Sequence, residues 1–565
     1  MCERISLPLL SSKSSAPSSR AFARCSLASI VALCAAASAM RAWLQFSTPL
    51  APGMNGAYYF VQARALLEHG RLGIPDLPLT FWLQAGLARL VAAITGWPLD
   101  DAIVFAVKLA DSVLPPMAAL PIAWLAARWQ RADGQPSLVA ALAPAALVCA
   151  SAAPLSMTGD FQKNSLALVW LAGTAWAAHR FLSGPTLVRA AALVGGLALL
   201  GTTHVGVLGA ALVFLAVLGA VAAVAAPAEV RRRLLLAALV GLVALAGAAA
   251  VTYRYDPARV QRLWRAIAEP SSVLSESRDR GDHPPGPPPG FAPPDFAAGT
   301  APVDHPRPPP GFGPPGAPRG ILGTLPRVLF LGVGIAATAW ALRRWSSLPV
   351  ADRALAIAAG VSAAVLGGGF FDAQKSERLM LIAVVPAAIA GSFLLAQVRR
   401  DLPRATLGIV VVFLAVLSGA LYVARGGRQI LTVEQRDELR TLAPLIASPE
   451  RTLIVAHHGL EWWTAWTLRT HIAQPTAVSR EDWQRYDHIY YLSEKSGVPR
   501  GRGGPPGAIG APGSGPPPGM GPEGATPENA VTVHDGPLFT LSRVDEAPED
   551  QPTDAEVQAQ RLKRQ

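Results

Sequence analysis

Long apolar runs recur along this chain, and each can cross the hydrocarbon core of a membrane. About 17 to 25 apolar residues suffice for one helical crossing. The chain is 51% hydrophobic and only 15% charged, unlike a soluble globule of its size. We therefore predict an all-α polytopic membrane protein with about eleven spans. The runs lie near 26–46, 102–126, 137–153, 164–182, 187–203, 205–226, 233–252, 326–342, 354–371, 379–397 and 405–423.

Clusters of arginine lie at the ends of these apolar runs and indicate an orientation. Lys and Arg are retained preferentially on the cytoplasmic side of a membrane. We expect an inner (cytoplasmic) membrane protein of bacterial type whose N-terminus and arginine clusters are cytoplasmic. The net charge of +11 then reflects topology and not a nucleic-acid partner. The clusters are Arg128/Arg131, Arg180/Arg189, 231–233, Arg343/Arg344 and Arg399/Arg400/Arg404.

The run 77–94 is ambiguous, because it is nearly long enough to cross but contains Gln84, Gly86 and Arg89. If it crossed, every later arginine cluster would lie outside while the basic N-terminus stayed inside, against the positive-inside rule. We therefore predict a helix lying at the outer membrane surface. The outer segments are then 47–101, 154–163, the turn 202–204, 372–378 and everything after Tyr422.

The chain divides by composition into three parts. Residues 1–24 read as a disordered cytoplasmic N-terminus, 25–423 as the transmembrane domain, and 424–565 as an exported, periplasmic α/β domain with a disordered tail. Two Pro/Gly-rich stretches, 281–319 and 496–527, have too little apolar surface to fold. We interpret them as disordered insertions, with a ligand for a proline-binding groove as the alternative.

The exported part shows alternating helix and strand patterns. An amphipathic helix is expected over 433–445 and strands over 452–456 and 488–492. Residues 531–533 and 538–544 read as a hairpin around Asp535-Gly536. These elements predict a small α/β domain outside the membrane.

Two acids, Asp76 and Asp160, lie on adjacent outer segments. Either could act as a general base or supply part of a metal site. The alternative is that each caps a helix, because Asp is favoured at helix starts: Asp76 the interfacial helix and Asp160 the span that follows it.

Basic residues on the same predicted face could meet a lipid phosphate, which Arg can bind through two hydrogen bonds. They are Lys163, Lys375, Arg71 and Arg378, although Lys375 and Arg378 could instead pair with Asp372 and Glu377.

Three further sites are ambiguous. Lys108 and Asp111 share a helical face at membrane depth, so we expect them to pair with each other, with a cavity wall as the alternative. His204 lies at an outer turn, where it contacts substrate or is simply hydrogen-bonded within the fold. His457-His458 lacks partners at metal-ligand spacing, so a zinc site there is not expected.

The first outer segment resembles that of a known family. After Asn55, apolar residues at helical spacing lead to Gly70, and a proline precedes the interfacial run. This order resembles the multispan glycosyltransferases of the GT-C type, most closely the catalytic subunit of oligosaccharyltransferase. In that family a metal-binding Asp opens the loop, and Asn55 occupies its place.

Three later stretches are similar to the same family. Residues 156–167 resemble its second acidic motif, and Arg378-Leu379-Met380-Leu381 with Pro386 resembles the segment whose arginine binds lipid-linked phosphate. Residues 461–466 resemble the double-tryptophan motif that holds the acceptor, which assigns acceptor binding to Trp462 and Trp463.

The sequence also departs from the family pattern. Asn55 replaces the first acid, Gln162 and Asn164 stand where the second motif carries carboxylates, and Thr464 replaces the Asp beside the tryptophans. Mg²⁺ and Mn²⁺ prefer anionic oxygen ligands, which amides do not supply. A divalent metal is therefore an open question, and no metal ligand is assigned.

The resemblance implies transfer of a sugar from a polyprenyl-phosphate-linked donor to an envelope acceptor at the outer face. Asp160 and Asp76 are the candidate catalytic residues. The alternative is a non-catalytic relative that binds lipid-linked saccharide or scaffolds an envelope complex. A transporter is disfavoured because the spans show no convincing repeat. The candidate substrate-binding residues are Asn55, Lys163, Asn164, His204, Lys375, Arg378, Trp462 and Trp463.

Overall fold

The computed structural model describes most of the membrane domain and most of the C-terminal domain. The Pro/Gly-rich stretch 281–319 and residues 496–525 lie outside the described set, as do residues 1–16. The described residues are 17–132, 137–225, 228–255, 260–261, 321–370, 373–398, 401–426, 429–495, 526–527, 529–548 and 551–557.

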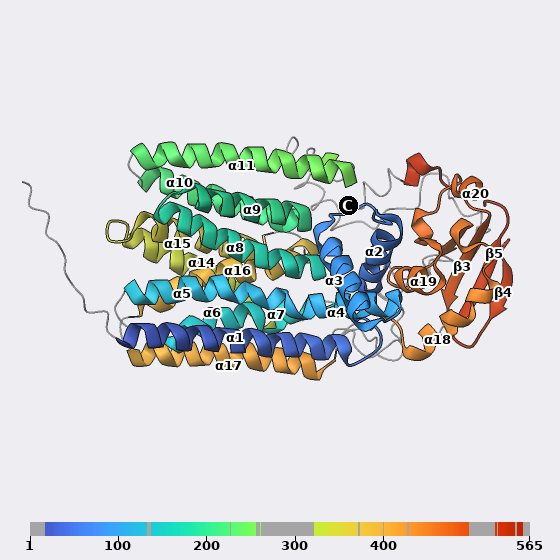
Figure 1. Cartoon of the computed structure of the whole chain (residues 1–565), viewed down its shortest axis with the longest axis horizontal. Coiled ribbons are helices and arrows are strands. Elements are labelled where there is room, and N and C mark those ends of the chain that lie inside the picture. The colour runs from blue at the N-terminus through green and yellow to red at the C-terminus, as the bar shows by residue number, and fades with distance from the viewer. Residues whose placement is uncertain are drawn as a thin grey trace, which may run out of the picture.

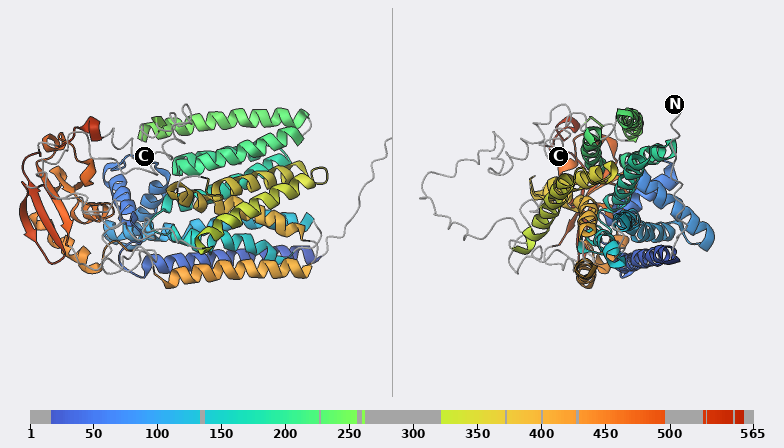
Figure 2. Two further views of the ribbon diagram at one scale, coloured as in Figure 1. Left: turned by 180° about the vertical axis from the view of Figure 1, so that it is seen from behind. Right: turned by 90° about the vertical axis from the view of Figure 1, so that its left-hand side faces the viewer.

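The membrane domain is a bundle of helices that run side by side along the long axis of the molecule, with the C-terminal domain at one end (Figures 1 and 2). The first helix begins at Pro17, earlier than predicted. The helices of the bundle are α1 (Pro17–Phe46), α4 (Leu99–Val113), α5 (Ala119–Ala132), α6 (Leu138–Cys149), α7 (Ala152–Ser156), α8 (Gln162–Ser183), α9 (Leu187–Thr203), α10 (Val205–Ala225), α11 (Ala228–Tyr255), α14 (Ile321–Arg343), α15 (Val350–Gly367), α16 (Ala373–Gln397) and α17 (Asp401–Ala424), with a 3₁₀ turn η1 (Pro115–Ala118) between α4 and α5.

Seven helical stretches in the described residues are long and apolar enough to cross a membrane. The chain is therefore built as a multi-pass membrane protein, while the predicted number of about eleven spans is not confirmed. Helices α8, α9, α11 and α14 lie alongside these stretches in the same bundle (Figure 1). The seven are Leu27–Phe46, Leu99–Gln130, Leu138–Ser156, Val205–Ala225, Val350–Gly367, Arg378–Gln397 and Leu402–Ala424.

Two helices of the first loop, α2 (Gly56–His69) and α3 (Leu79–Thr95), lie between the bundle and the C-terminal domain (Figure 1). Both end at a glycine in the left-handed conformation, Gly70 with φ 68° and Gly96 with φ 70°. Gly70 was the predicted end of the first helix. With 17 residues, α3 is apolar but shorter than the seven candidate spans, which agrees with its interpretation as an interfacial helix.

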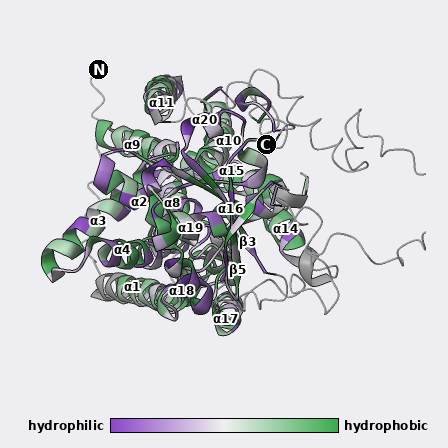
Figure 3. Cartoon of the chain, turned by 90° about the vertical axis from the view of Figure 1, so that its right-hand side faces the viewer, coloured by the Kyte–Doolittle hydropathy of each residue, from purple (hydrophilic) through white to green (hydrophobic). Residues whose placement is uncertain are grey.

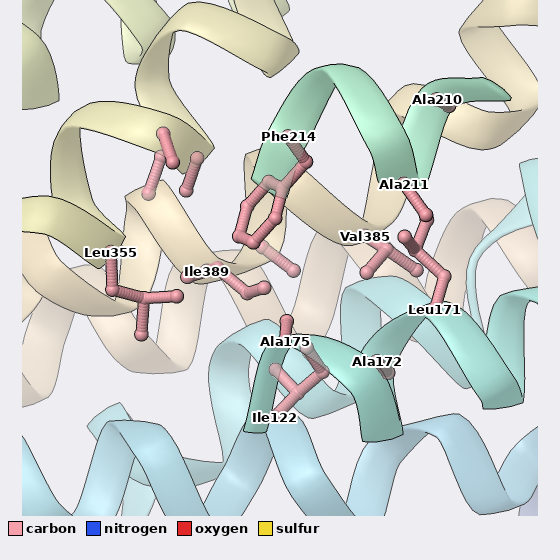
Figure 4. Close-up of a cluster of buried hydrophobic side chains, with 14 of the residues drawn as sticks. Ile122, Leu171, Ala172, Ala175, Ala210, Ala211, Phe214, Leu355, Val385 and Ile389 are labelled. Carbon is pink, nitrogen blue, oxygen red and sulfur yellow. The ribbon is translucent and has the colours of Figure 1, made fainter. Parts of the chain in front are cut away.

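The centre of the bundle is an apolar core between α5, α8, α10, α15 and α16 (Figure 4). Ile122, Leu171, Phe214, Leu355 and Ile389 meet there, and none is more than 5% exposed. Alanines fill the spaces between them, because small residues allow membrane helices to approach closely.

The C-terminal domain contains one five-stranded sheet in the order β2-β1-β3-β5-β4. β1 pairs in parallel with β2 and β3, and the β4–β5 hairpin joins antiparallel to β3. The strands are β1 (Thr452–Val455), β2 (His471–Ala473), β3 (His488–Glu494), β4 (Val531–Asp535) and β5 (Phe539–Val544), accompanied by α18 (Val433–Thr441), α19 (Leu460–Leu468), α20 (Asp482–Arg485) and the short turns η2 (Ala443–Leu445), η3 (Pro449–Arg451) and η4 (Pro475–Ala477).

Aromatic side chains join this domain to the first loop. The Phe60 ring of α2 lies 6.1 Å from Trp463 and 5.3 Å from Trp466 between ring centroids. The Arg64 guanidinium stacks 3.5 Å from the Trp466 ring and donates to the Trp466 carbonyl. Viewed from the domain side, α2, α8 and α19 project near the middle of the bundle outline (Figure 3).

Candidate functional site

Two loops from distant parts of the chain meet at the domain-bearing end of the bundle. Gly53 and Gly159 both have a left-handed backbone, with φ of 87° and 80°. A Cβ on Gly159 would lie 2.1 Å from the carbonyl oxygen of Pro52. Only glycine permits this approach, which brings Asn55 next to Asp160.

Asp160 is held by Asn55. Its Oδ1 accepts the Asn55 backbone N–H at 3.0 Å and the Asn55 Nδ2 at 2.7 Å. The residue is half-buried. The N-cap residue of α8 is Phe161 and no side chain caps the helix, so the interpretation of Asp160 as a simple helix cap is wrong.

Asp76 is 2% exposed and pairs with Lys163 of α8 and with the hydroxyl of Tyr58. Its second oxygen accepts the backbone N–H of Leu77 at 2.7 Å. The N-cap of α3 is Pro78, without a side-chain cap, so capping does not explain Asp76 either. Burial raises the pKa of Tyr58 well above its ordinary value, and the Asp76 carboxylate raises it further. Tyr58 therefore stays a protonated donor to Asp76.

Helix α2 links the two acids. The Tyr59 hydroxyl donates to the Asp160 carbonyl at 3.4 Å and accepts the backbone N–H of Lys163 at 3.4 Å. Gln62 donates to the Tyr58 hydroxyl at 3.0 Å. The predicted residues Asn55, Asp76, Asp160 and Lys163 thus belong to one hydrogen-bonded cluster.

A buried ion pair lies below this cluster. The Arg41 Nη2 donates to Asp111 Oδ1 at 2.7 Å, and the two side chains are at most 1% exposed. The other oxygen of Asp111 accepts Gln45 Nε2 at 2.7 Å and the backbone N–H of Gly159 at 2.8 Å. The predicted Lys108–Asp111 pair is wrong. Lys108 instead donates to the Thr48 carbonyl at 2.9 Å, because Arg41 on the facing helix reaches Asp111.

The C-terminal domain brings the loop that carries His458 against the first loop. This loop lies between β1 and α19, where Gly459 has φ 100° and a Cβ would lie 3.1 Å from the Met54 side chain. His458 Nδ1 is 2.8 Å from Glu461 Oε1, and Glu461 is 2% exposed. The hydrogen bond to Glu461 raises the pKa of His458 above 6.5, and the Asp160 carboxylate adds to the shift. His458 itself remains 45% exposed.

The two predicted acceptor-binding tryptophans differ in their surroundings. Trp462 is half-buried, with its ring centroid 4.8 Å from that of Tyr58. Trp463 is 3% exposed and packs against Phe60 in the interface between the domain and α2. Thr464 is fully buried and bonds within its own helix.

The remaining predicted residues lie on other elements. His204 Nδ1 accepts the backbone N–H of Val207 at the start of α10. Asn164 is 8% exposed in the first turn of α8. Arg378 is exposed near the start of α16, and the Lys375 side chain lies outside the described residues. Substrate contacts of these four stay predictions.

In the part of the chain that the structure describes, the side chains of the cluster do not match the ligand set of a divalent metal. At the position where the sequence resemblance implies an acid, the Asn55 amide donates a hydrogen bond to Asp160. An amide is not the anionic ligand that would pair with Asp160 around a metal. Within the described ranges, no three His, Cys, Asp or Glu side chains group as metal ligands.

Sequence reasoning did not assign Arg41, Gln45 and Gln62 to the site. It considered His458 only as a zinc ligand and Glu461 only as part of the double-tryptophan stretch. Two of these residues carried a signal, because Arg41 and Gln45 lie inside an apolar span, where polar groups need a partner. His458 carried none, since its loop reaches the first loop only through the fold.

The fold is similar to that of solved glycosyltransferases. The crystal structure of the Archaeoglobus fulgidus oligosaccharyltransferase in the apo form matches with a TM-score of 0.51 and 12% identity, over 82% of this chain and 69% of that chain. ArnT from Cupriavidus metallidurans matches with a TM-score of 0.44 and 12% identity in the apo state, over 93% of this chain and 100% of ArnT. The ArnT structure bound to undecaprenyl phosphate matches with a TM-score of 0.47 and 12% identity, over 92% of this chain and 99% of ArnT.

No protein-family model and no curated protein matches the sequence. The likeness to the archaeal enzyme confirms the resemblance inferred from the order of motifs, at the level of the fold. The chain thus has the GT-C fold of the membrane-embedded glycosyltransferases.

Proposed function

We propose that the protein is a membrane glycosyltransferase, which transfers a sugar from a polyprenyl-phosphate-linked donor to an envelope acceptor at the outer face of the inner membrane. The supporting observation is the cluster around Asp160. The first loop and the segment before α8 bring Asn55 and Asp160 into contact, and the C-terminal domain places the loop of His458 against Met54 of the same first loop. A GT-C fold with polar groups collected at one end suits this reaction.

Asp160 is the better candidate for the base. It is half-buried, whereas Asp76 is 2% exposed and already neutralised by Lys163. In the proposed step the acceptor hydroxyl oxygen bonds to the anomeric carbon of the sugar and gives its proton to the Asp160 carboxylate. The bond from that carbon to the phosphate oxygen breaks, and the electron pair leaves with the polyprenyl phosphate. A single displacement of this kind inverts the anomeric centre.

Asp76 then acts as a positioning residue. It pairs with the ammonium group of Lys163 and accepts a hydrogen bond from the Tyr58 hydroxyl. The Lys163 ammonium group also lies over the Tyr58 ring. His458, held by Glu461 in the loop that contacts Met54, is a candidate to donate a hydrogen bond to the phosphate of the donor. Arg378 and Lys375 remain further candidates for this phosphate.

A groove at the same end of the bundle can receive the lipid tail. It lies between α1 and α17, has a volume of about 720 Å³, and is lined on the membrane side by Met40, Trp43, Val416 and Ala420. Arg425 lines its outer end, where an anionic head group is favoured.

The test is glycan profiling of a deletion strain complemented with variants. Asp160→Asn keeps the shape of the side chain but removes the base, so we expect the deletion profile. Asp437→Asn, on the exposed surface of α18, is the matched control and restores the normal profile. Transfer in proteoliposomes supplied with polyprenyl-phosphate sugars checks the same pair. Full activity of Asp160→Asn in both assays would contradict the proposed mechanism.

The non-catalytic alternative draws on the neutral residues at the motif positions. Gln162 and Thr464 stand at motif positions but carry no acid. Gln162 accepts a hydrogen bond from Gln84 at 2.6 Å, and Thr464 donates one to a carbonyl within its own helix. A protein that only binds saccharide or assembles a complex predicts that deletion alters the glycans while Asp160→Asn does not.

A further inference from the structure

The contact between Asn55 and Asp160 is a complete hydrogen-bonded clamp. The backbone N–H of Asn55 and one N–H of its side-chain amide are directed at one carboxylate oxygen, at 3.0 and 2.7 Å. A carboxylate at position 55 could not make the side-chain bond, because it has no N–H to donate.

The two loops are also in direct backbone contact. A Cβ on Gly53 would lie 2.5 Å from the Cβ of Asp160, and a Cβ on Gly159 would meet Pro52. The backbone N–H of Gly159 is in turn held by the buried carboxylate of Asp111. These contacts hold the backbone of Asp160 next to Asn55.

The neighbouring acids are committed to protein partners. Asp76 pairs with Lys163, Glu461 bonds to His458, and Asp111 pairs with an arginine of α1. Among the residues that the structure describes, Asp160 thus has no second free carboxylate of the kind that Mg²⁺ or Mn²⁺ prefers.

We infer that the Asn55–Asp160 clamp takes the place of a bridging divalent cation, and that this centre works without one. The inference rests on the proposed function for its catalytic meaning. It also makes a prediction about binding that needs no substrate: a single change, Asn55→Asp, converts the clamp into a pair of carboxylates able to bind Mn²⁺.

The experiment is a Mn²⁺ titration of the purified full-length protein in detergent, with free Mn²⁺ read by electron paramagnetic resonance. We expect wild type and Asp160→Asn to bind the same small background. Asn55→Asp gains one Mn²⁺ per chain, and Asn55→Asp combined with Asp160→Asn loses it again. Asn529→Asp, the same chemical change in the C-terminal domain, is the control and gains none.

Thermal unfolding provides a second readout on the same samples. The unfolding temperature of wild type should be the same in EDTA and in Mn²⁺. Asn55→Asp should unfold earlier in EDTA, because two carboxylates face each other, and recover when Mn²⁺ is added.

Two results of the binding experiment would overturn the inference. One is Mn²⁺ bound to wild type and lost in Asp160→Asn. The other is folded Asn55→Asp that gains no Mn²⁺. If the binding results are as expected but no sugar transfer is found, the proposed function fails while the clamp stands. If transfer is found and EDTA abolishes it, the inference fails and the function stands.

Discussion

Asp76 and Asp160 carry the same chemical group, but their neighbours assign them different tasks. Asp76 is buried and matched by Lys163, so its charge stabilises the loop. The Asp160 carboxylate accepts N–H donors from Asn55 at Oδ1, and the residue stays half-buried, so it is the better candidate for the proposed base. The sequence predicted both residues, because acids in outer loops of an apolar chain are few. Their difference could not be predicted, since it depends on contacts across more than eighty positions.

The Arg41–Asp111 pair shows why a nearby partner is not always the right one. Spacing favoured Lys108, three positions away, but the fold supplies Arg41 from another helix. We expect Asp111→Asn to lower the free energy of unfolding by about 3–5 kcal/mol, because Arg41 is left buried without its counter-charge. Thermal unfolding in detergent measures this.

The control is Asp487→Asn, which breaks an exposed pair with Arg451 and should cost less than about 1 kcal/mol. Equal effects of Asp111→Asn and Asp487→Asn would contradict the structural role of the buried pair.

His458 should make stability depend on pH. Its pKa is raised above 6.5 by the hydrogen bond to Glu461. The contribution of the charged imidazole to the free energy of unfolding is therefore fully present below pH 6.5, and it is lost as the pH rises through the raised pKa. We expect the difference in unfolding temperature between wild type and His458→Gln to shrink on the alkaline side. A difference that does not change with pH would mean that the charged form of His458 makes no contribution.

At the scale of elements, periodicity and turn residues predicted most of what is seen. The helix ending at Gly70, the strands β1 and β3 and the β4–β5 hairpin all form close to their predicted positions. Strand β2 was missed because it has only three residues and is stabilised by pairing with β1. Helix α19 was read only as the double-tryptophan motif and not as a helix.

The contact between the loops should be intolerant of a side chain. Gly159→Ala adds a Cβ that overlaps Pro52, and it places alanine in a left-handed backbone conformation that alanine disfavours. We therefore expect either no folded protein or a free energy of unfolding lowered by several kcal/mol. Gly70→Ala is the matched control: it is equally left-handed, with φ 68°, but has open space around it, so only about 1 kcal/mol is expected. Yield and unfolding temperature of the two variants measure this, and equal tolerance would argue against close loop contact.

At the scale of the whole molecule, the order of motifs between apolar runs predicted the GT-C fold, which the archaeal enzyme shares at 12% identity. The number of spans was harder to predict, because helices such as α8 carry polar residues toward the core and fall below the hydropathy of a typical span. Orientation stays a prediction from the arginine clusters. The sequence did not predict that the first loop, α8 and the C-terminal domain lie together. These contacts are seen only in the three-dimensional structure.

The central claim is that the loops bearing Asn55 and Asp160 lie in one compartment and touch. Cysteine cross-linking in intact membranes tests it most directly, with Cys2, Cys25, Cys34 and Cys149 replaced. The pair Asn55→Cys with Asp160→Cys should form a cross-link detected by mass spectrometry. Asn55→Cys with Ser347→Cys, which lies between α14 and α15 at the opposite end of the bundle, should not (Figure 1). Labelling of positions 55 and 160 from opposite sides of the membrane, without a cross-link, would contradict the account.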